Sequence, residues 1–417
     1  MRSFSQYITE ETVKNLHMEH IEDEVFNNGV VGARESILFL LSIRDMLSGS
    51  SESSVDITVK FDGAPAIFTG IDPLDGKFFV GTKGVFNKNP KIIKSPSDVA
   101  LYGYKGQLAN KVLVAFNELQ KLNIKNVLQG DMMFTQGDLT DVEVDGQQYI
   151  TFQPNTIVYA VPARSVLAQK IKNAKIGIVF HTTYSGNSLE EMGATFGADV
   201  SNLTKSNNVW FSSAEYQDKT GTVTLTKEET GVLTSFLSNA GKAFRKVDSK
   251  SLNNLLEVQS DLPSSLIGAS IKTYLNSLVR AGKSVTSVKG HGKSYINFLS
   301  SLFQEKIIPK VRSDSAKEKK REQRDIIIKN IRKNNKTLEA VMELYVNVTQ
   351  AKQIIIDKLN SGPKKFPNTF VRTDSGYKVV SDEGYVAIDK IKGNAVKLVD
   401  RMEFSYNNFN GIKNWDK

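Results

Sequence analysis

The 417-residue sequence contains no cysteine, and this absence excludes several kinds of chemistry at once. Disulfide bonds, cysteine-ligated zinc sites and thiol nucleophiles all require that residue. A chain without cysteine is compatible with a reducing compartment, although composition alone does not require one. Any covalent catalysis must therefore use a side chain other than a thiol.

Long hydrophobic runs are also missing. No apolar stretch approaches the length of about 18 residues that marks a transmembrane helix, and the chain does not start with a basic stretch followed by an apolar one. We therefore expect neither a membrane span nor a signal peptide. With 40% hydrophobic and 24% charged residues, the composition is typical of a soluble globular protein, and the length predicts two structural units.

Positive charge is in excess and is unevenly distributed. The formal net charge is +9, and residues 305–336 hold twelve Lys and Arg against five Asp and Glu, a net of +7. Such a segment favours a polyanionic partner such as nucleic acid. The basic side chains that we expect to contact nucleic acid are Lys319, Lys320, Arg321 and Arg324. The alternative is a solvated helix, because acidic residues lie among these basic ones.

Hydrophobic patterns divide the chain into segments of different character. Helices are predicted for residues 10–26 and 32–47, with a stop at Asn27-Asn28-Gly29 between them. Short strands separated by turn signals follow from residue 55, interrupted by a helix at 107–122. The predicted organisation is N-terminal helices packed on the core (1–54), the first part of the core (55–188), a helical insertion (189–362) and the last strands of the core (363–417).

Lys60-Phe61-Asp62-Gly63 is the most informative stretch. It ends an alternating run that predicts a strand, and the small residues after it predict a turn. A lysine at the end of a buried strand can carry a covalent intermediate once its ammonium loses a proton. Desolvation and nearby cations lower a lysine pKa, and Gly63 lets a phosphate approach the backbone. The alternative is a hairpin with a surface lysine.

Further short motifs follow in order along the chain. They are Gly81-Thr82-Lys83-Gly84, Gly130-Asp131, Ile157-Val158-Tyr159, Glu383-Gly384-Tyr385-Val386 and Val396-Lys397-Leu398. Together with the Lys60 motif, they resemble the motifs of the covalent nucleotidyltransferase superfamily, which includes ATP-dependent DNA ligases, RNA ligases and mRNA capping enzymes. The resemblance implies an α+β fold with an antiparallel ligase-type core, into which the helical segment is inserted.

The resemblance also implies roles for the matched residues. Lys60 is expected to attack the α-phosphate of ATP and to hold AMP as a phosphoramidate. The expected nucleotide contacts are Asp62, Gly63, Lys83, Tyr159 and Lys397, with Tyr159 stacking on the base. Asp131 and Glu383 are expected to hold Mg²⁺ or Mn²⁺. This set agrees with the chemistry, because attack on a triphosphate needs a nucleophile, cations on the phosphates and carboxylates on a metal.

The histidines at two places in the chain can each be interpreted in two ways. His17 and His20 are three residues apart in an acidic segment, so a metal site is conceivable, although a capped and partly exposed helix explains them more simply. His181 lies at the polar end of the apolar run 176–184. It could face the nucleotide pocket, but a structural histidine at a strand end is the simpler interpretation.

The chain also departs from the superfamily's pattern. Asp131 stands where Glu is usual, and Val399 replaces the second lysine of the last motif, for which Arg401 or Lys392 could substitute. Thr58 stands where a Glu is often found, and the Arg that follows the first motif in DNA ligases is missing. Only sixteen residues follow Arg401. We therefore expect no C-terminal OB domain, which favours the RNA-ligase side of the superfamily.

The predicted function is that of an ATP-dependent polynucleotide (RNA or DNA) ligase that works through a lysyl-adenylate. Two alternatives stay open. The same fold could modify a protein or small molecule instead, or the chain could be a catalytically degenerate structural or nucleic-acid-binding protein of a phage. The combination of motifs also resembles proteins of tailed bacteriophages, which implies the cytoplasm of an infected bacterium, with association with the virion as a further option.

Overall fold

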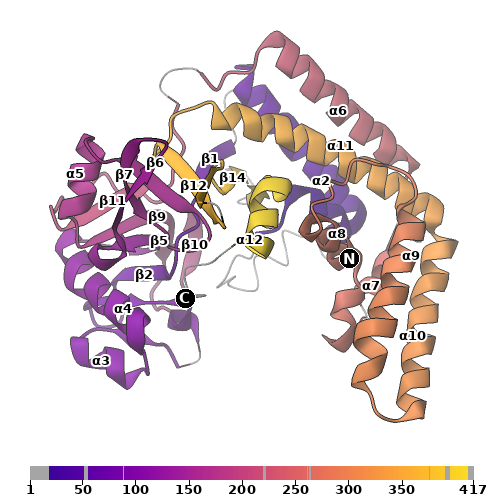
Figure 1. Ribbon diagram of the computed structural model, residues 1–417, viewed down its shortest axis with the longest axis horizontal. Coiled ribbons are helices and arrows are strands. Elements are labelled where there is room, and N and C mark those ends of the chain that lie inside the picture. The colour runs from indigo at the N-terminus through magenta and orange to yellow at the C-terminus, as the bar shows by residue number, and fades with distance from the viewer. Residues whose placement is uncertain are drawn as a thin grey trace.

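The computed structural model describes residues 18–50, 55–87, 89–218, 222–260, 262, 264–374, 376–389 and 395–411. These residues form a mixed α+β fold whose sheets are mainly antiparallel, which confirms the predicted α+β class. Figure 1 shows a lobe built from the sheets and an arm of long helices that arches away from it. Residues 10–17 of the first predicted helix lie outside the described residues.

A small sheet joins the early and late parts of the chain. β1 (Val55–Lys60) pairs antiparallel with β14 (Gly384–Asp389), which pairs antiparallel with β15 (Ala395–Leu398). The predicted strand before the Lys60 motif is therefore confirmed. Val59 lies opposite Tyr385 in this ladder, and Lys60 lies opposite Gly384. The register thus sets Lys60 beside the residue that follows Glu383.

A large sheet forms the centre of the lobe (Figure 1). Its order is β10 (Gly193–Phe196), β9 (Ile176–Ser185), β5 (Val127–Thr135), β2 (Ala66–Ile71), β3 (Phe78–Gly81) and β4 (Ile92–Ile93), and β11 (Val209–Ser213) pairs parallel with β9. A third sheet has the order β13 (Gly376–Val379), β12 (Asn368–Thr373), β8 (Val158–Pro162), β7 (Gln147–Phe152) and β6 (Thr140–Val144).

Short helices cover the lobe. They are α3 (Pro96–Leu101), α4 (Gly106–Leu119) and α5 (Val166–Asn173). On α4, Val112, Ala115 and Leu119 recur at helical spacing, and all three are buried against the large sheet. The helix predicted at 107–122 is confirmed as α4 followed by the turn η3 (Gln120–Leu122).

Long helices form the arm. α2 (Glu24–Leu47), α6 (Lys227–Lys246) and α11 (Asn335–Asn360) pack against one another. The outer end of the arm contains α7 (Ser249–Ser260), α9 (His291–Leu302) and α10 (Asp314–Lys333), and α8 (Ile271–Arg280) lies nearer the lobe, beside α12, as Figure 1 shows. The chain then returns to the lobe, and α12 (Tyr406–Asn410) ends the described part. Within the described residues, no helix is long and apolar enough to cross a membrane.

Short helical turns connect these elements. The 3-10 turns are η1 (Ile21–Asp23), η2 (Lys83–Phe86), η3, η4 (Gln136–Asp138), η5 (Ser264–Ala269) and η7 (Ile308–Lys310), and the π turns are η6 (Phe303–Ile307) and η8 (Arg401–Ser405). Two of them position the site described below, because η2 carries Lys83 and η1 packs beside β15.

The segment boundaries differ from those expected. β10 and β11 still belong to the large sheet, so the helical insertion begins at α6 and not at residue 189. The N-terminal helix α2 packs mainly against helices of the arm. The stop predicted at Gly29 is a kink inside α2, where this glycine has φ +57° and ψ −132°.

Gly384 tests the β1–β14 pairing. Its φ is +142°, and an added Cβ would lie 2.5 Å from the Leu398 carbonyl oxygen. Gly384→Ala should therefore lower the free energy of unfolding by about 2–3 kcal/mol, from backbone strain and the clash with β15. Gly231 on α6 is the control, because a Cβ there meets nothing within 4 Å. Gly231→Ala should gain up to about 1 kcal/mol. Urea unfolding measures both, and equal effects would contradict this assignment.

Candidate active site

A cavity of about 430 Å³ lies between the small sheet and the large sheet. Its walls include residues of β1, β5, β9, β10 and β15. The sequence-predicted site residues that line it are Lys60, Gly63, Lys83, Asp131 and Lys397. The fold therefore brings together residues that lie more than 300 positions apart in the chain.

Lys60 and Glu383 form an ion pair beside this cavity. The Lys60 ammonium donates a hydrogen bond to Glu383 Oε1, and Glu383 is buried. Burial lowers the pKa of Lys60, but contact with Glu383 outweighs burial and holds that pKa above its ordinary value. Burial raises the pKa of Glu383 to about 7, although Lys60 pulls it down. The lysine is therefore held as an ammonium, next to a carboxylate that binds a proton readily.

Lys83 and Lys397 approach the cavity from different elements. Lys83 starts the turn η2 after β3, and Lys397 lies on β15. Burial, together with the positive charge of Lys60, lowers the pKa of Lys397. This repulsion indicates that Lys60 and Lys397 share one electrostatic environment, in which an anion entering the cavity would relieve the repulsion.

Asp62 has a structural position that the sequence did not predict. Its carboxylate is buried and accepts hydrogen bonds from the Thr156 amide at 2.6 Å, the Ile157 amide at 2.8 Å and the Asn155 side chain at 2.6 Å. It does not line the cavity. The expected contact of Asp62 with nucleotide does not fit this geometry, and the residue instead ties the turn after Lys60 to the loop before β8.

Tyr159 is also inside the core. Its ring is fully buried against Phe61, Phe152 and Phe366, and its hydroxyl accepts a hydrogen bond from the Asp62 amide at 2.8 Å. A base cannot stack on a ring that is covered on all sides, so the role predicted for Tyr159 is wrong in this structure. The aromatic residues that do line the cavity include Tyr184 and Phe196.

Gly63 brings the turn after Lys60 close to β5. A Cβ on this glycine would lie 2.5 Å from the Asp131 Cβ and 3.1 Å from the Met132 carbonyl oxygen. A larger residue would push the turn away from Asp131. The glycine is therefore needed for packing, in addition to any approach of a phosphate.

His181 also lines the cavity, although the sequence favoured a structural histidine at a strand end. Its Nε2 lies 3.7 Å from Asp131 Oδ2. In the part of the chain that the structure describes, no group of three or more histidine and acidic side chains could hold a metal ion by itself. The cavity thus offers a pair of such donors, Asp131 and His181, whereas Glu383 is engaged with Lys60.

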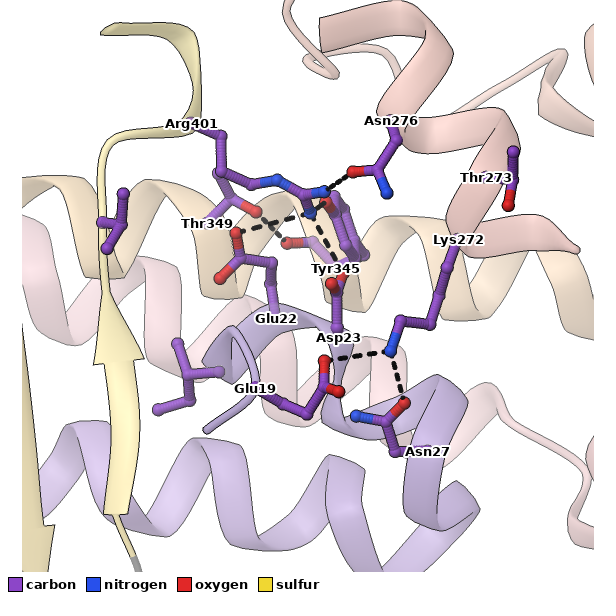
Figure 2. A network of polar contacts seen from close by, with 12 residues as sticks. Glu19, Glu22, Asp23, Asn27, Lys272, Thr273, Asn276, Tyr345, Thr349 and Arg401 are labelled. Carbon is purple, nitrogen blue, oxygen red and sulfur yellow. Dashed lines mark hydrogen bonds and ion pairs between the residues drawn. The ribbon is translucent and has the colours of Figure 1, made fainter. Parts of the chain in front are cut away.

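A buried network of charges fixes the position of β15. The N-terminal segment runs beside this strand, and the Lys397 amide donates to the Glu19 carbonyl at 3.0 Å. Figure 2 shows that Arg401 reaches Asp23, Tyr345 and Asn276, while Lys272 holds Glu19. These contacts connect the N-terminal segment, the end of β15 and helices α8 and α11.

The most deeply buried ion pair in this network joins Lys352 and Glu22, which are 1% and 0% exposed. Lys352 Nζ lies 2.6 Å from Glu22 Oε1 and also donates to the Val399 carbonyl at 2.8 Å. Glu22 and Asp23, which follow His20, are therefore buried beside the last strand, whereas His17, the other histidine considered for a metal site, lies outside the described residues. Burial lowers the pKa of His20 to about 3, which keeps that ring neutral.

Arg401 does not substitute for the lysine missing at Val399. Its guanidinium is buried, 3.1 Å from Asp23 and 2.8 Å from the Tyr345 hydroxyl, and it does not line the cavity. The other expected substitute, Lys392, lies outside the described residues. Of the basic residues proposed for this end of the chain, Lys397 is the one that the structure brings to the cavity.

The basic residues of α10 lie at the outer end of the arm, far from the cavity (Figure 1). Two of the four predicted nucleic-acid contacts are paired with acidic residues of the same helix, Arg321 with Glu318 at 2.7 Å and Arg324 with Asp325 at 2.9 Å. These pairs agree with the alternative of a solvated helix. Lys319 and Lys320 lie on the same helix.

The Lys352–Glu22 pair should dominate the stability of this region. Lys352→Met leaves a buried carboxylate without its closest cation, so the free energy of unfolding should fall by about 3–5 kcal/mol. The matched control is Lys246→Met, which breaks an exposed pair with Glu343 and should cost at most about 1 kcal/mol. Urea unfolding compares the two. A loss for Lys352→Met no larger than the control would contradict the role of this pair.

Comparison with known proteins places the chain in a family. No curated protein and no solved structure matches it. Residues 15–413 match a family described as a family of unknown function, DUF6267. This match covers the strands of the lobe, the helical arm and every residue that lines the cavity. The chain therefore belongs to the DUF6267 family.

Proposed function

We propose that this chain is an ATP-dependent nucleotidyltransferase with a ligase-type core, which forms a covalent AMP adduct on Lys60 and passes the AMP to the 5′-phosphate of a polynucleotide. The observation that carries the proposal is the cavity itself. A lysine paired with a buried carboxylate opens into the same space as Lys83, Lys397 and Asp131. This is the set of groups that attack on a nucleoside triphosphate requires.

The lysines support binding of phosphates. Lys60, Lys83 and Lys397 place positive charge around a space in which Asp131 is the carboxylate on the wall. Burial and mutual repulsion, seen in the lowered pKa of Lys397, make this arrangement costly without an anion. A triphosphate would neutralise the lysines in a site with reduced access to water, where each contact is stronger than in bulk solvent.

Glu383 supports the activation of Lys60. The nucleophile is the neutral amine, so the ammonium must first lose a proton. Glu383 Oε1 already accepts a hydrogen bond from Nζ, and burial raises the Glu383 pKa to about 7. In the proposed step one proton moves to Glu383, the Nζ lone pair forms a bond to the α-phosphorus, and a second proton passes from Nζ to water. The bond from the α-phosphorus to the β-phosphate oxygen breaks. Pyrophosphate leaves with that electron pair.

A divalent cation fits beside the phosphates. Asp131 is an oxygen donor on the cavity wall, 22% exposed, and is thus open to a cation that also binds phosphate oxygens. Bound Mg²⁺ or Mn²⁺ would neutralise charge on the phosphates during the attack. Glu383, the other expected metal ligand, is assigned here to Lys60, because its contact in the structure is with the ammonium.

The second half of the proposed reaction uses a polynucleotide. Its 5′-phosphate oxygen would attack the AMP phosphorus, the P–N bond to Lys60 would break, and the lysine would recover its proton. A 3′-hydroxyl would then displace AMP and join the strands. The net charge of +9 and the basic segment 305–336 support an acceptor of negative charge.

A second candidate has a different acceptor. Another cavity, of about 640 Å³, adjoins the first and shares Thr58 and Phe196 with it. Its charged residues are Asp56, Asp199 and Glu215 against Lys365. A polyanion would be repelled by this lining, so it favours AMP transfer to a protein or small molecule. Competition in a single labelled assay, with a nicked polynucleotide against a basic peptide, separates the two acceptors.

Lys60→Arg tests the nucleophile. The guanidinium keeps the charge but stays protonated, so it cannot attack the phosphate. Wild-type protein incubated with α-³²P-ATP and Mg²⁺ should take label into an acid-labile, alkali-stable adduct, and Lys60→Arg should take none. Lys94→Arg is the control, because Lys94 pairs with Asp72 outside the cavity, and it should label as wild type does. Label retained in Lys60→Arg would exclude this nucleophile, and no label in wild type would favour a degenerate site.

Charge reversal on α10 tests the polynucleotide surface. Each phosphate contact adds about 0.7–0.9 to the slope of log affinity against log salt. Changing the four basic residues of α10 to Glu should therefore weaken polynucleotide binding and flatten this slope, while labelling of Lys60 persists. The residues to change are Lys319, Lys320, Arg321 and Arg324, and the exposed control set on the lobe is Lys105, Lys125, Lys170 and Lys172.

Fluorescence anisotropy with a labelled single-stranded polynucleotide measures the binding affinity of both variant proteins. The α10 variant should lose affinity and the lobe variant should bind as wild type does. The same affinity and slope in wild type and the α10 variant would identify α10 as a solvated helix, in line with its internal ion pairs.

A further inference from the structure

His181 occupies a β-bulge that turns its side chain into the cavity. In the ladder between β5 and β9, Gln129 lies opposite Thr182, and the next residue, Gly130, lies opposite Phe180. His181 is therefore the extra residue on β9. Neighbouring residues of a regular strand face opposite sides of the sheet, yet His181 and Thr182 both line the cavity. Bulges often redirect a side chain next to an active site in this way.

The ring of His181 is within hydrogen-bond distance of Thr182 at one nitrogen and faces Asp131 with the other. Nδ1 lies 2.8 Å from the Thr182 hydroxyl oxygen, and Nε2 lies 3.7 Å from Asp131 Oδ2. A histidine that binds a metal usually holds its other ring nitrogen in a hydrogen bond, which fixes the tautomer and the direction of the lone pair. In the tautomer that donates Nδ1–H to Thr182, the Nε2 lone pair points to the side on which Asp131 lies.

The separation of the two donors suits a shared cation. Two ligands that each lie about 2.1 Å from one metal ion are about 3–4 Å apart, and the observed distance is 3.7 Å. Both side chains are partly accessible, His181 at 27% and Asp131 at 22%. An ion can therefore enter from the cavity, and water or phosphate oxygens can complete its coordination.

We propose that His181 and Asp131 together bind a divalent cation in this cavity, and that the imidazole makes the site prefer a first-row transition ion such as Mn²⁺ over Mg²⁺. Mg²⁺ is bound through oxygen ligands and retains much of its water, whereas imidazole nitrogen is a ligand of transition ions. The site extends the proposed nucleotidyltransferase function, because the bound ion faces the space assigned to the phosphates. Binding of the ion alone does not depend on that function.

Titration of the full chain with Mn²⁺, followed by electron paramagnetic resonance, tests the proposal. Wild-type protein should bind Mn²⁺ at one site, and Mg²⁺ should displace it only in excess of about tenfold or more. His181→Gln should weaken Mn²⁺ binding by at least about tenfold while changing Mg²⁺ binding much less. Equal Mn²⁺ affinity in wild type and His181→Gln would overturn the proposal, as would equal preference for the two ions in wild type.

Further variants separate the site from the fold and from the proposed function. Asp131→Asn should also lose Mn²⁺, whereas Thr182→Val, which keeps the imidazole but removes its hydroxyl partner, should show a smaller loss. Lys94→Arg, which changes a lysine outside the cavity, should bind Mn²⁺ as wild type does. Binding that depends on His181 in a protein that forms no AMP adduct would keep the metal site and reject the nucleotidyltransferase. If the AMP adduct forms but wild-type protein shows no preference for Mn²⁺ over Mg²⁺, the nucleotidyltransferase function is kept and the metal site is rejected.

Discussion

The antiparallel pairing of β1 with β14 is the contact on which the rest of the structure depends. It joins Lys60 to Glu383 across 323 residues, so the elements from β2 to β13 form one long connection between the paired strands. The entropy lost in closing a loop rises only slowly with its length. Buried residues of the ladder, among them Val59, Tyr385 and Ala387, supply the apolar area that offsets this loss. The register of the pair then decides which residues meet in the cavity.

The buried ion pairs of the arm also help to position the cavity, because they hold the end of β15. Glu22 and Lys352 would each be costly to bury alone, but together they hold the end of β15 through the Val399 carbonyl. Hydrogen bonding between Glu19 and Lys397 continues this support to the cavity wall. The helical arm is thus part of the scaffold of the candidate site, since α11 provides Lys352 and α8 provides Lys272.

Short-range patterns in the sequence predicted the strands, the helix and the site lysines that are recognisable from neighbouring residues alone. Alternation before Lys60 predicted β1, helical spacing predicted α4, and Lys83 and Lys397 were singled out together with the strands that precede or carry them. Tyr159 was misread because an aromatic residue on a strand can face either a pocket or the core, and sequence does not say which face is covered. The buried role of Glu22 was missed because its partner, Lys352, lies 330 residues away. His181 depends on a bulge, and an extra residue in a ladder becomes visible only when the register is known.

Peptide mapping shows which lysine carries AMP and therefore tests whether Lys60 is the nucleophile. Protein incubated with ATP and a divalent cation is digested under alkaline conditions that preserve a phosphoramidate, and mass spectrometry locates the added AMP. We expect AMP on the peptide that contains Lys60 and none on the peptides of Lys83 and Lys397, because the Lys60 Nζ contacts a carboxylate able to take its proton. AMP on one of the other lysines, or on no peptide, would contradict this assignment.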